Sequence, residues 1–437
     1  MEYFHSVRLD WSRCKGCTNC IKRCPTEAIR VREGKAYIIQ ERCIDCGECI
    51  RVCPNHAKTA VGDSLEELSA YQYNIALPAP SFVSQFAPRA SLEQTLGSLI
   101  SLGFDAIFEV ALAAEIVSKA ARRYLDNYRG KRPLISPACP AVVGLIQVRF
   151  PSLLDQLLPL ATPMDVAARL AKREGVAASG LPPEAVGTFF ISPCPAKITA
   201  ARQRRNGLAG PDGVIPMRDI YGDVLQNLKS AAPYPSRAGA GGYGWGHSGG
   251  EKKCIGGPHL LEVDGINQVI DVLTMIEAGY LQDIDYLEMQ ACPGGCVGGA
   301  LMVTNPYVAR MRLRELTSRI GPRPEELPEA GDSLKPYSYL PRPALRLDPD
   351  LATALEKMHQ VEATDKMLPG LDCGACGAPS CRAFAEDVVR GEAQDIDCII
   401  VLRERVRVVA EEVVELARKL PVSMARPERG NDKDEAE

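Results

Sequence analysis

The seventeen cysteines of this chain constrain its fold more than any other feature of its 437 residues. Sixteen of them fall into three groups: eight before residue 54, four in proline-containing motifs in the middle of the chain, and four after residue 372. Cys254 stands outside these groups. Thiolates are soft ligands that suit iron–sulfur clusters and zinc. The layout therefore predicts a protein that holds metal and is suited to moving electrons.

The composition is that of an ordinary soluble globular protein, with 46% apolar and 24% charged residues. The 51 basic and 55 acidic residues give a net charge of −4, which favours neither a nucleic-acid nor a membrane partner. Apolar runs of about 18 residues are absent, so we expect no transmembrane helix. The first residues have no apolar segment and reach a cysteine motif by Cys14, so we expect neither a secretory signal peptide nor a twin-arginine signal. So many cysteines without an export signal indicate metal ligands in a reducing cytoplasm rather than disulfides.

The first sixty residues contain a repeated cysteine motif. Its two copies are Cys14-x2-Cys17-x2-Cys20-x3-Cys24-Pro25 and Cys43-x2-Cys46-x2-Cys49-x3-Cys53-Pro54. In this pattern, the fourth cysteine of each run binds the cluster of the other run. We therefore assign one [4Fe–4S] cluster to Cys14, Cys17, Cys20 and Cys53, and a second to Cys43, Cys46, Cys49 and Cys24. A pair of zinc sites is the alternative. Residues 35–40 predict a short strand, and residues 6–60 resemble bacterial dicluster ferredoxins.

From about residue 70 to 345, short apolar runs alternate with helical periodicity, which predicts an α/β domain. The expected helices are Leu92–Leu102, Ala111–Tyr124 and Ile266–Ala278, and the expected strands are Asn74–Leu77, Pro133–Ile135, Thr188–Ile191 and Tyr286–Met289. Three of these strands lead into loops that contain Cys139, Cys194, and the pair Cys292 and Cys296. Ligands collect beyond the carboxyl ends of such strands, so four thiols delivered there could hold one cluster. Taken singly, Cys139 and Cys194 could instead be ordinary buried cysteines.

The third of these loops has a spacing that suits close approach to a metal. Cys292 and Cys296 are expected on one face of a helical turn. Gly294 and Gly295 between them would let the backbone come near the cluster.

The three loops resemble the signature motifs of [FeFe]-hydrogenases, in the family's usual order. Residues 136–140, Ser-Pro-Ala-Cys-Pro, resemble the family's T-S-C-C-P, and residues 192–197, Ser-Pro-Cys-Pro-Ala-Lys, resemble M-P-C-x-x-K. Residues 288–299 resemble E-x-M-A-C-P-G-G-C-x-x-G-G, and residues 79–81 resemble an A-P-S segment that lines the same pocket. The resemblance covers about residues 70–310.

The resemblance implies an H-cluster, which is a [4Fe–4S] cubane joined through one thiolate to a diiron unit with CO, CN⁻ and azadithiolate ligands. Matching motif to motif, the cubane would be held by Cys139, Cys194, Cys292 and Cys296, and Cys296 would supply the bridge. Lys197 would donate to a cyanide ligand, with a solvated surface lysine as the alternative. Ser81 would line the pocket of the diiron unit.

Several positions depart from the family's motifs. Ala138 stands where prototypical hydrogenases carry a proton-relay cysteine, and a positioned acid–base group is typically worth about 10²–10⁴-fold in rate. The remaining departures are Ser192 and Gln290 in methionine positions, Ala200 in a glutamate position, and Ala120 and Ala121 where relay glutamates are expected. These changes indicate slow turnover and resemble the sensory, group-D-like type.

The glycine-rich segment Ala238–Gly250 is interpreted as a flexible loop that covers the site. His247 and Cys254, in or near this segment, are candidates for a substitute proton donor. An ordinary loop histidine and a spare thiol are the alternatives.

The last part of the chain predicts one more cluster. A proline-rich linker near Pro336–Pro343 precedes Cys373-x2-Cys376-x4-Cys381-x16-Cys398. This pattern resembles the small [4Fe–4S] domain of Rnf-type electron-transfer subunits and of corrinoid-protein partners, with zinc as the alternative. A helix is expected at Ser380–Val389. A second, amphipathic helix is expected at 399–420, suited to docking on this module or on a partner helix.

The expected fold is an α/β H-cluster domain at residues 61–345, with a ferredoxin-like α+β domain before it at 1–60. A small, mostly helical iron–sulfur domain would follow at 346–424, with a disordered tail at 425–437. The expected function is slow interconversion of protons, electrons and H₂, as a cytoplasmic H₂ or redox sensor. Expected partners are a ferredoxin-like or signalling protein and the hydrogenase maturation proteins. The alternatives are a true hydrogenase with an altered proton path, and a cubane-only electron-transfer or scaffold protein.

Overall fold

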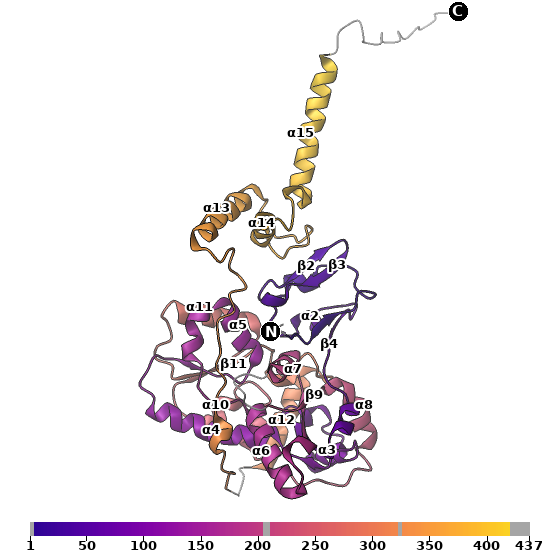
Figure 1. The fold of residues 1–437 in the computed structure, drawn as a ribbon, viewed down its shortest axis with the longest axis vertical. Helices are drawn as coiled ribbons and strands as arrows, with labels where there is room; N and C mark the ends of the chain where they lie inside the picture. Colours follow the sequence, from indigo (N-terminus) through magenta and orange to yellow (C-terminus); the bar gives the residue numbers. More distant parts are fainter. Residues whose placement is uncertain (1–3, 204–209, 322–325, 420–437) are drawn as a thin grey trace, which may run out of the picture. The chain divides into compact units, whose positions relative to one another are not determined.

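The computed structural model describes residues 4–203, 210–321 and 326–419, and the chain divides into two compact units, Met1–Leu345 and Arg346–Glu437 (Figure 1). Within the described residues, no helix is both long enough and apolar enough to cross a membrane. The tail expected at 425–437 lies outside the described residues.

The first sixty residues form two small antiparallel ribbons with two short helices. Strand β1 pairs with β4, and β2 pairs with β3. The bounds are β1 Val7–Leu9, α1 Asn19–Lys22, β2 Ile29–Arg32, β3 Lys35–Ile38, α2 Glu48–Arg51 and β4 Lys58–Ala60. The cysteine repeat is also a repeat of backbone conformation, because matching positions take positive φ angles. These matched pairs are Gly16 with Asp45, Thr18 with Gly47, and Glu27 with His56.

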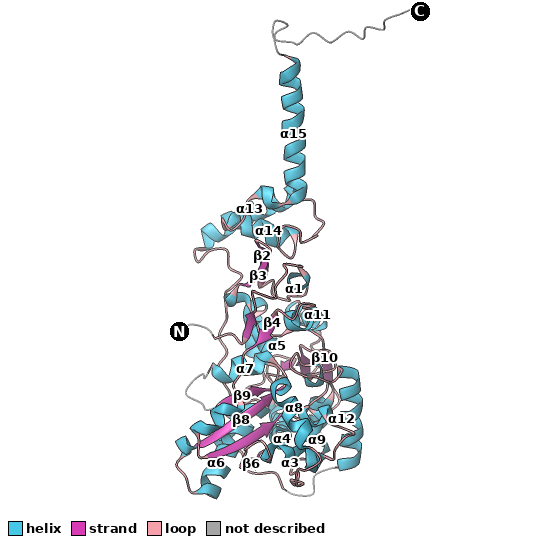
Figure 2. Ribbon diagram, turned by 90° about the vertical axis from the view of Figure 1, so that its right-hand side faces the viewer, coloured by secondary structure: helices cyan, strands magenta, loops and turns pink. Residues whose placement is uncertain are grey.

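Two parallel sheets build the larger part of the first unit (Figure 2). One has the order β6-β5-β8-β9 and the other the order β10-β11-β7, and all of their pairings are parallel. The bounds are β5 Tyr73–Pro78, β6 Ala106–Ile107, β7 Leu134–Ile135, β8 Val186–Ser192, β9 Gly213–Pro216, β10 Leu260–Asp264 and β11 Tyr286–Gln290. The four predicted strands are confirmed as β5, β7, β8 and β11. Their division between two sheets was not predicted.

Helices cover both sheets, and each sheet has its own buried apolar cluster. The bounds are α3 Leu92–Ile100, α4 Val110–Asn127, α5 Pro140–Arg149, α6 Pro163–Ser179, α7 Pro195–Arg202, α8 Met217–Asn227, α9 Ala240–Gly244, α10 Gly250–Ile255, α11 Ile266–Glu277 and α12 Pro306–Ile320. The predicted helices at 92–102, 111–124 and 266–278 are confirmed as α3, α4 and α11. Cys139 and Cys194 are the N-cap residues of α5 and α7, and a proline opens each helix, as its fixed φ favours.

Two local predictions were wrong. The glycine-rich segment 238–250 is not a flexible loop, because α9 and the start of α10 lie within it. A Cβ at Gly242 would lie 2.0 Å from the carbonyl oxygen of Ala111, so the absent side chain lets α9 pack directly on α4. The stretch from Cys292 to Cys296 is not a helical turn either. Gly294 and Gly295 have φ angles of 77° and 93°, and the 3-10 turn η6 begins only at Cys296.

The proline-rich segment near 336–343 lies along the first unit rather than free of it. The Tyr337 hydroxyl donates to Asp165 at 3.2 Å. The Arg342 guanidinium donates to the carbonyl oxygens of Glu41 and Cys43 at 2.9 Å each.

The second unit is helical around a small apolar cluster. The bounds are α13 Leu351–Met367, α14 Cys381–Val389, the 3-10 turn η8 Asp395–Asp397 and α15 Ile399–Arg418. The helices predicted at 380–389 and 399–420 are confirmed as α14 and α15, except that residue 420 is outside the described residues.

Candidate metal centre

Four strand ends from two different sheets meet at the centre of the first unit. β7 and β11 are neighbours in one sheet and lead to Cys139 and Cys292. β5 and β8 are neighbours in the other, and lead to residues 79–81 and to Cys194. Within each sheet the strands are parallel, so their carboxyl ends lie at one edge. Residues from the loops after all four strands line one cavity, which places these two edges together. The structure thus brings together every motif that the sequence singled out in this domain.

The four thiols at this place lie close enough to influence one another's charge. Burial raises the pKa of Cys194 far above its ordinary value, and the thiolates of Cys292, Cys296 and Cys139 raise it further, against the opposing effect of Lys197. Burial also raises the pKa of Cys296 to about 12. A bound iron cluster would supply the positive charge that stabilises the thiolate forms of Cys194 and Cys296.

Gly295 lets the Cys292–Cys296 loop close over the centre. Its φ of 93° lies in the left-handed region, and a Cβ there would come within 2.2 Å of the Gln290 amide oxygen and 2.6 Å of the Ser248 nitrogen. A side chain at residue 295 would therefore push Cys296 out of place.

Lys197 lies on the first turn of α7, just after Cys194, and points back across the centre. Its ammonium donates to the carbonyl oxygen of Ala138 at 2.9 Å. Burial opposes its charge, but the nearby thiolates of Cys296 and Cys194 more than compensate and raise its pKa. The structure therefore places a fixed, partly buried cation among the four thiols.

A cavity of about 50 Å³ lies beside Cys296. Most of its lining is apolar, and the residues that bear on its chemistry are Ala138, Cys139, Lys197, Trp245, Gln290 and Cys296. Ala79 and Pro80 also line it. Ser81, the next residue, is fully buried, and no described residue forms a hydrogen bond with its hydroxyl. The amide oxygen of Gln290 is likewise buried without a partner. Buried polar atoms in this state are normally satisfied by some bound group.

Two buried glutamates lie behind Gln290. The Gln290 amide donates to Glu288 at 3.2 Å, and Glu288 also accepts from the backbone nitrogens of Gly249 and Lys252. Burial, with the nearby Glu251, raises the pKa of Glu288 to about 8. Glu251 accepts from the Ser136 hydroxyl at 2.7 Å and from the Tyr286 hydroxyl at 2.5 Å, and burial raises its pKa to about 7.

Sequence reasoning did not single out Glu251 or the role of Glu288 as its neighbour. Glu288 opens the third motif, so its position is evident from the sequence, but Glu251 lies just after the glycine-rich segment 238–250, on helix α10, where no motif marks it.

The proposed substitute proton donors lie elsewhere. His247 and Cys254 line a larger cavity of about 840 Å³, together with Ser248 and Lys252, and neither lines the smaller one. Burial lowers the pKa of His247, whose Nδ1 lies 2.8 Å from the Ser248 carbonyl oxygen. Burial raises the pKa of the Cys254 thiol.

The other departures from the motifs are spread around the centre. Ser192 exchanges hydrogen bonds with the backbone of Cys194, accepting from its nitrogen and donating to its carbonyl oxygen. Ala200 lines a separate cavity, and Ala121 is buried in an apolar cluster with Leu134 and Tyr286.

The two cysteine sets of the N-terminal repeat surround two separate cavities of about 20 Å³ each. One is lined by Cys14, Cys17, Cys20 and Cys53, and the other by Cys24, Cys43, Cys46 and Cys49. These are the same two sets that the motif spacing grouped. In the second unit, Cys376, Cys381 and Cys398 share one apolar cluster, while Cys373 is exposed.

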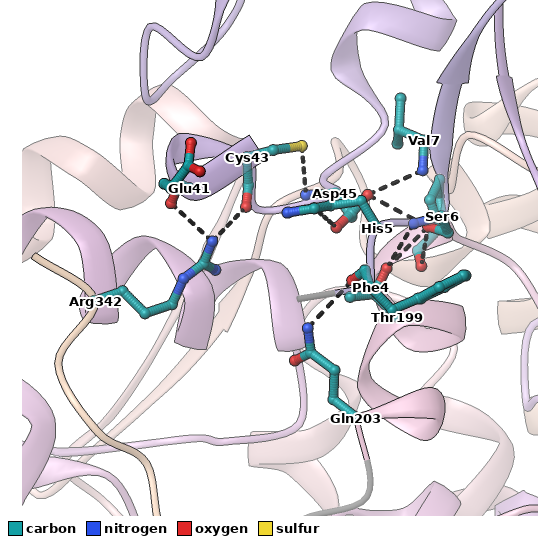
Figure 3. A network of polar contacts seen from close by, with 11 residues as sticks. Phe4, His5, Ser6, Val7, Glu41, Cys43, Asp45, Thr199, Gln203 and Arg342 are labelled. Carbon is teal, nitrogen blue, oxygen red and sulfur yellow. Dashed lines mark hydrogen bonds and ion pairs between the residues drawn. The ribbon is translucent and has the colours of Figure 1, made fainter. Parts of the chain in front are cut away.

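The N-terminal segment is anchored to the helix that carries Lys197 (Figure 3). The Ser6 nitrogen donates to the Thr199 hydroxyl at 3.1 Å, and the Ser6 hydroxyl donates to the Pro195 carbonyl oxygen at 2.9 Å. Asp45 ties this strand to the second cysteine run, since it accepts from the Val7 nitrogen and contacts the His5 ring at 2.8 Å. These contacts fix the repeat against the thiol centre.

Cys46 and Arg51 make the direct link between the two metal regions. A Cβ added to Gly47 would lie 2.6 Å from the Ala300 side chain, so the Cys46 loop touches the loop that follows Cys296. The Arg51 guanidinium reaches the Cys292 sulfur at 3.9 Å and also donates to the Gly298 carbonyl oxygen. The role of Arg51 could not be predicted from the sequence, because it depends on a contact with Cys292, which is distant in sequence.

Three family models match this chain. The model for the C-terminal domain of the iron-only hydrogenase large subunit matches residues 72–221 and 251–300. A 4Fe-4S dicluster domain matches residues 6–54, and an Fe-S cluster family matches residues 368–400. The resemblances drawn from the motifs to [FeFe]-hydrogenases and to dicluster ferredoxins are thereby confirmed.

Curated relatives and solved structures agree with these matches. The chain is 24% identical over 343 residues to the NADP-reducing hydrogenase subunit HndD of Solidesulfovibrio fructosivorans, which covers 65% of this chain and 55% of the relative. It is 24% identical over 254 residues to iron hydrogenase 1 of Clostridium pasteurianum, covering 46% and 44%. The chain thus spans about half the length of these relatives. A structure of [FeFe]-hydrogenase HydA1 from Chlamydomonas reinhardtii matches with a TM-score of 0.51 at 16% identity, over 64% of this chain and 98% of that one. At this identity, the match shows the fold of the domain.

Proposed function

Because this chain belongs to the [FeFe]-hydrogenase family, we propose that it interconverts protons, electrons and H₂ slowly and serves as an H₂ or redox sensor of the group-D-like type. One observation carries the proposal. Two of the four thiols, Cys139 and Cys296, line a small cavity together with Lys197, and the described lining of this cavity holds no carboxylate or imidazole. Ala138 presents a methyl group there, so the proposed site keeps the residues that would hold the cofactor and lacks a thiol at the relay position.

The residues fit an H-cluster. Cys139, Cys194, Cys292 and Cys296 would hold the cubane, and Cys296 would bridge to the diiron unit in the adjoining cavity. When bound, this group supplies the reversible chemistry 2H⁺ + 2e⁻ ⇌ H₂. Lys197 would orient a cyanide ligand, since its ammonium is already held over the cavity by the Ala138 carbonyl oxygen. The buried hydroxyl of Ser81 is a second donor without a partner among the described residues.

The N-terminal repeat would deliver electrons through two [4Fe–4S] clusters. The cluster held by Cys24, Cys43, Cys46 and Cys49 would be the nearer one, because the Cys46 loop packs on the loop after Cys296. Arg51 joins the two regions and places a positive charge beside Cys292, which favours the reduced state of a cluster bound there. A further [4Fe–4S] cluster would occupy the four cysteines of the second unit.

A second candidate is a true H₂-evolving or uptake hydrogenase with an altered proton path. The Gln290–Glu288 contact favours it, since it connects the cavity to a buried carboxyl whose pKa is raised by burial into the neutral range. An amide does not titrate, so this connection would be a slow path unless water carries the proton past Gln290.

The expected surroundings follow from this chemistry. Its substrates would be H₂ and protons, its redox partner a ferredoxin-like or signalling protein, and its cofactor would come from hydrogenase maturation proteins. We place it in a reducing, anaerobic cytoplasm. The seventeen free thiols of the structure support that placement.

Infrared spectroscopy on the anaerobically maturated full chain tests the proposal. We expect CO and CN⁻ stretching bands with weak H₂ turnover. Cys296→Ser should remove the bands, while Cys254→Ser, a change at the cysteine outside the motifs, should leave them. Iron–sulfur absorption without bands would show a cubane-only protein and end the proposal. Turnover as fast as that of relay-cysteine enzymes would select the second candidate.

A further inference from the structure

Helix α15 leaves a complete apolar stripe exposed. The helix spans Ile399–Arg418, and none of its residues is buried. Figure 1 shows it as a straight rod leading away from α14 within the second unit. Its large apolar side chains follow one another at alternating steps of three and four residues: Ile399, Leu402, Val406, Val409, Val413 and Leu416. They are between 43% and 66% exposed. This alternation is the heptad spacing of a coiled-coil seam.

The composition of α15 argues against a helix that stands in solvent without a partner. Branched side chains lose rotamer freedom in a helix, and most helical stability in proteins comes from packing an apolar face. This helix is rich in them: Ile399, Ile400, Val401, Val406, Val408, Val409, Val413 and Val414. Several of its charged residues lie on the face opposite the seam and pair with one another, as Arg407 does with Glu404 and Glu411. The stripe is therefore the face that needs a partner.

We propose that α15 pairs with α15 of a second copy of this chain in a two-stranded coiled coil. The seam alternates two kinds of position. One holds Ile399, Val406 and Val413, and the other holds Leu402, Val409 and Leu416. Branched residues at the first kind with leucine at the second favour two strands over three or four.

The charges beside the seam allow a second copy to bind. Arg405 and Glu412 flank one side of it, and Arg403, Ala410 and Ala417 flank the other. If the two copies run antiparallel, Arg405 of one faces Glu412 of the other. If they run parallel, both residues face alanines of the second copy. Neither arrangement brings like charges together, and the antiparallel one adds two complementary pairs. Self-pairing is thus compatible with every flanking charge.

The test measures the oligomeric state of the anaerobically prepared full chain by light scattering and sedimentation. We expect a particle of twice the chain's mass. Val409→Glu, which puts a charge in the seam, should weaken the dimer by at least about 100-fold. Val408→Glu is the matched control, because Val408 is on the same helix but outside the seam, and should leave the dimer intact. Iron–sulfur absorption verifies that each variant keeps its clusters.

A gain-of-affinity variant separates the proposal from simple misfolding. Val409→Leu places the preferred residue at its seam position and should tighten the dimer several-fold. A wild-type monomer at every accessible concentration would overturn the proposal. So would equal effects of Val408→Glu and Val409→Glu, or a dimer that survives both. Cross-linking of the seam to residues 1–345 of the same chain would show that another surface covers it, with the same consequence.

Discussion

Ala138→Cys is the substitution that most directly tests the chemistry of this site. The hydrogen bonds of residue 138 are made by its backbone, and its methyl group packs against the edge of the apolar core. Its backbone nitrogen donates to the Ser136 hydroxyl at 3.2 Å, and its carbonyl oxygen accepts from the Lys197 ammonium at 2.9 Å. The methyl group lines the cavity beside Cys296. Replacing it by CH₂SH therefore adds one titratable group to the cavity and leaves those bonds in place.

The size of the gain depends on what lies behind the new thiol. A positioned acid–base group is worth about 10²–10⁴-fold. The upper end needs further acids to carry the proton onward, but Ala121 on α4 is buried in an apolar cluster, and no described carboxylate lines the cavity. The nearest chain of contacts passes through the Gln290 amide to Glu288. We therefore expect a gain at the low end, about 10²-fold, or about 2.7 kcal/mol of barrier.

The assay compares H₂ evolution and uptake of wild type, Ala138→Cys and Ala138→Ser, each normalised to its CO and CN⁻ infrared bands. Serine matches cysteine in size but does not titrate near neutral pH, so it should remain as slow as wild type. The cysteine variant should also show a new pH dependence of the rate. Equal rates for all three proteins, with equal band intensities, would refute the argument that proton supply at residue 138 limits turnover.

The remaining predictions concern charge at the two metal regions. Lys197→Met should abolish or greatly weaken the CN⁻ bands and leave the cubane signals in electron paramagnetic resonance, whereas Lys197→Arg should retain part of them. Arg51→Ala should shift the potential of the nearby cubane to more negative values in a redox titration, because a cation is lost beside Cys292; Arg51→Lys should shift it less. Glu251 has its pKa raised to about 7 by burial, from 4.5, so the folded protein keeps a proton that the unfolded chain has already lost. The free energy of unfolding should therefore fall as pH rises from about 4.5 through 7. Glu251→Gln, which can still accept from Ser136 and Tyr286, should flatten this thermal-unfolding profile; an unchanged slope would contradict the assignment.

The ligand loops could be predicted from sequence because their information is local. Each Cys-Pro pair marks a strand end followed by a helix, and α5 and α7 begin as that pattern predicts. The repeat before residue 54 carries its cluster assignment in its spacing, and the two small cavities group the cysteines in the same way. Fixed spacing and proline geometry determine these features without reference to the rest of the fold.

Features set by packing between distant segments could not be predicted in this way. In the sequence, the glycines at 242 and 250 are typical of a loop. In the structure they allow helices α9 and α10 to pack tightly, because a Cβ at Gly250 would lie 1.8 Å from the Gly244 carbonyl oxygen. Arg51 acts on Cys292 across a long sequence separation. The pairing of Glu251 with Glu288 likewise depends on α10 lying beside β11, which periodicity alone does not reveal.

The geometry around residue 138 explains how the side chain at this position can vary without disturbing the residues of the proposed cofactor site. Lys197 is positioned by the carbonyl oxygen of Ala138, and Cys139 by the helix start that follows it. Both depend on the backbone of this loop, and neither on the side chain at 138. Replacing a thiol by a methyl group there would therefore leave the four cysteines, the hydrogen bond of Lys197 and the start of helix α5 unchanged. Under the proposed function it would change proton supply, so the rate of turnover could be reduced independently of cofactor binding and electron delivery.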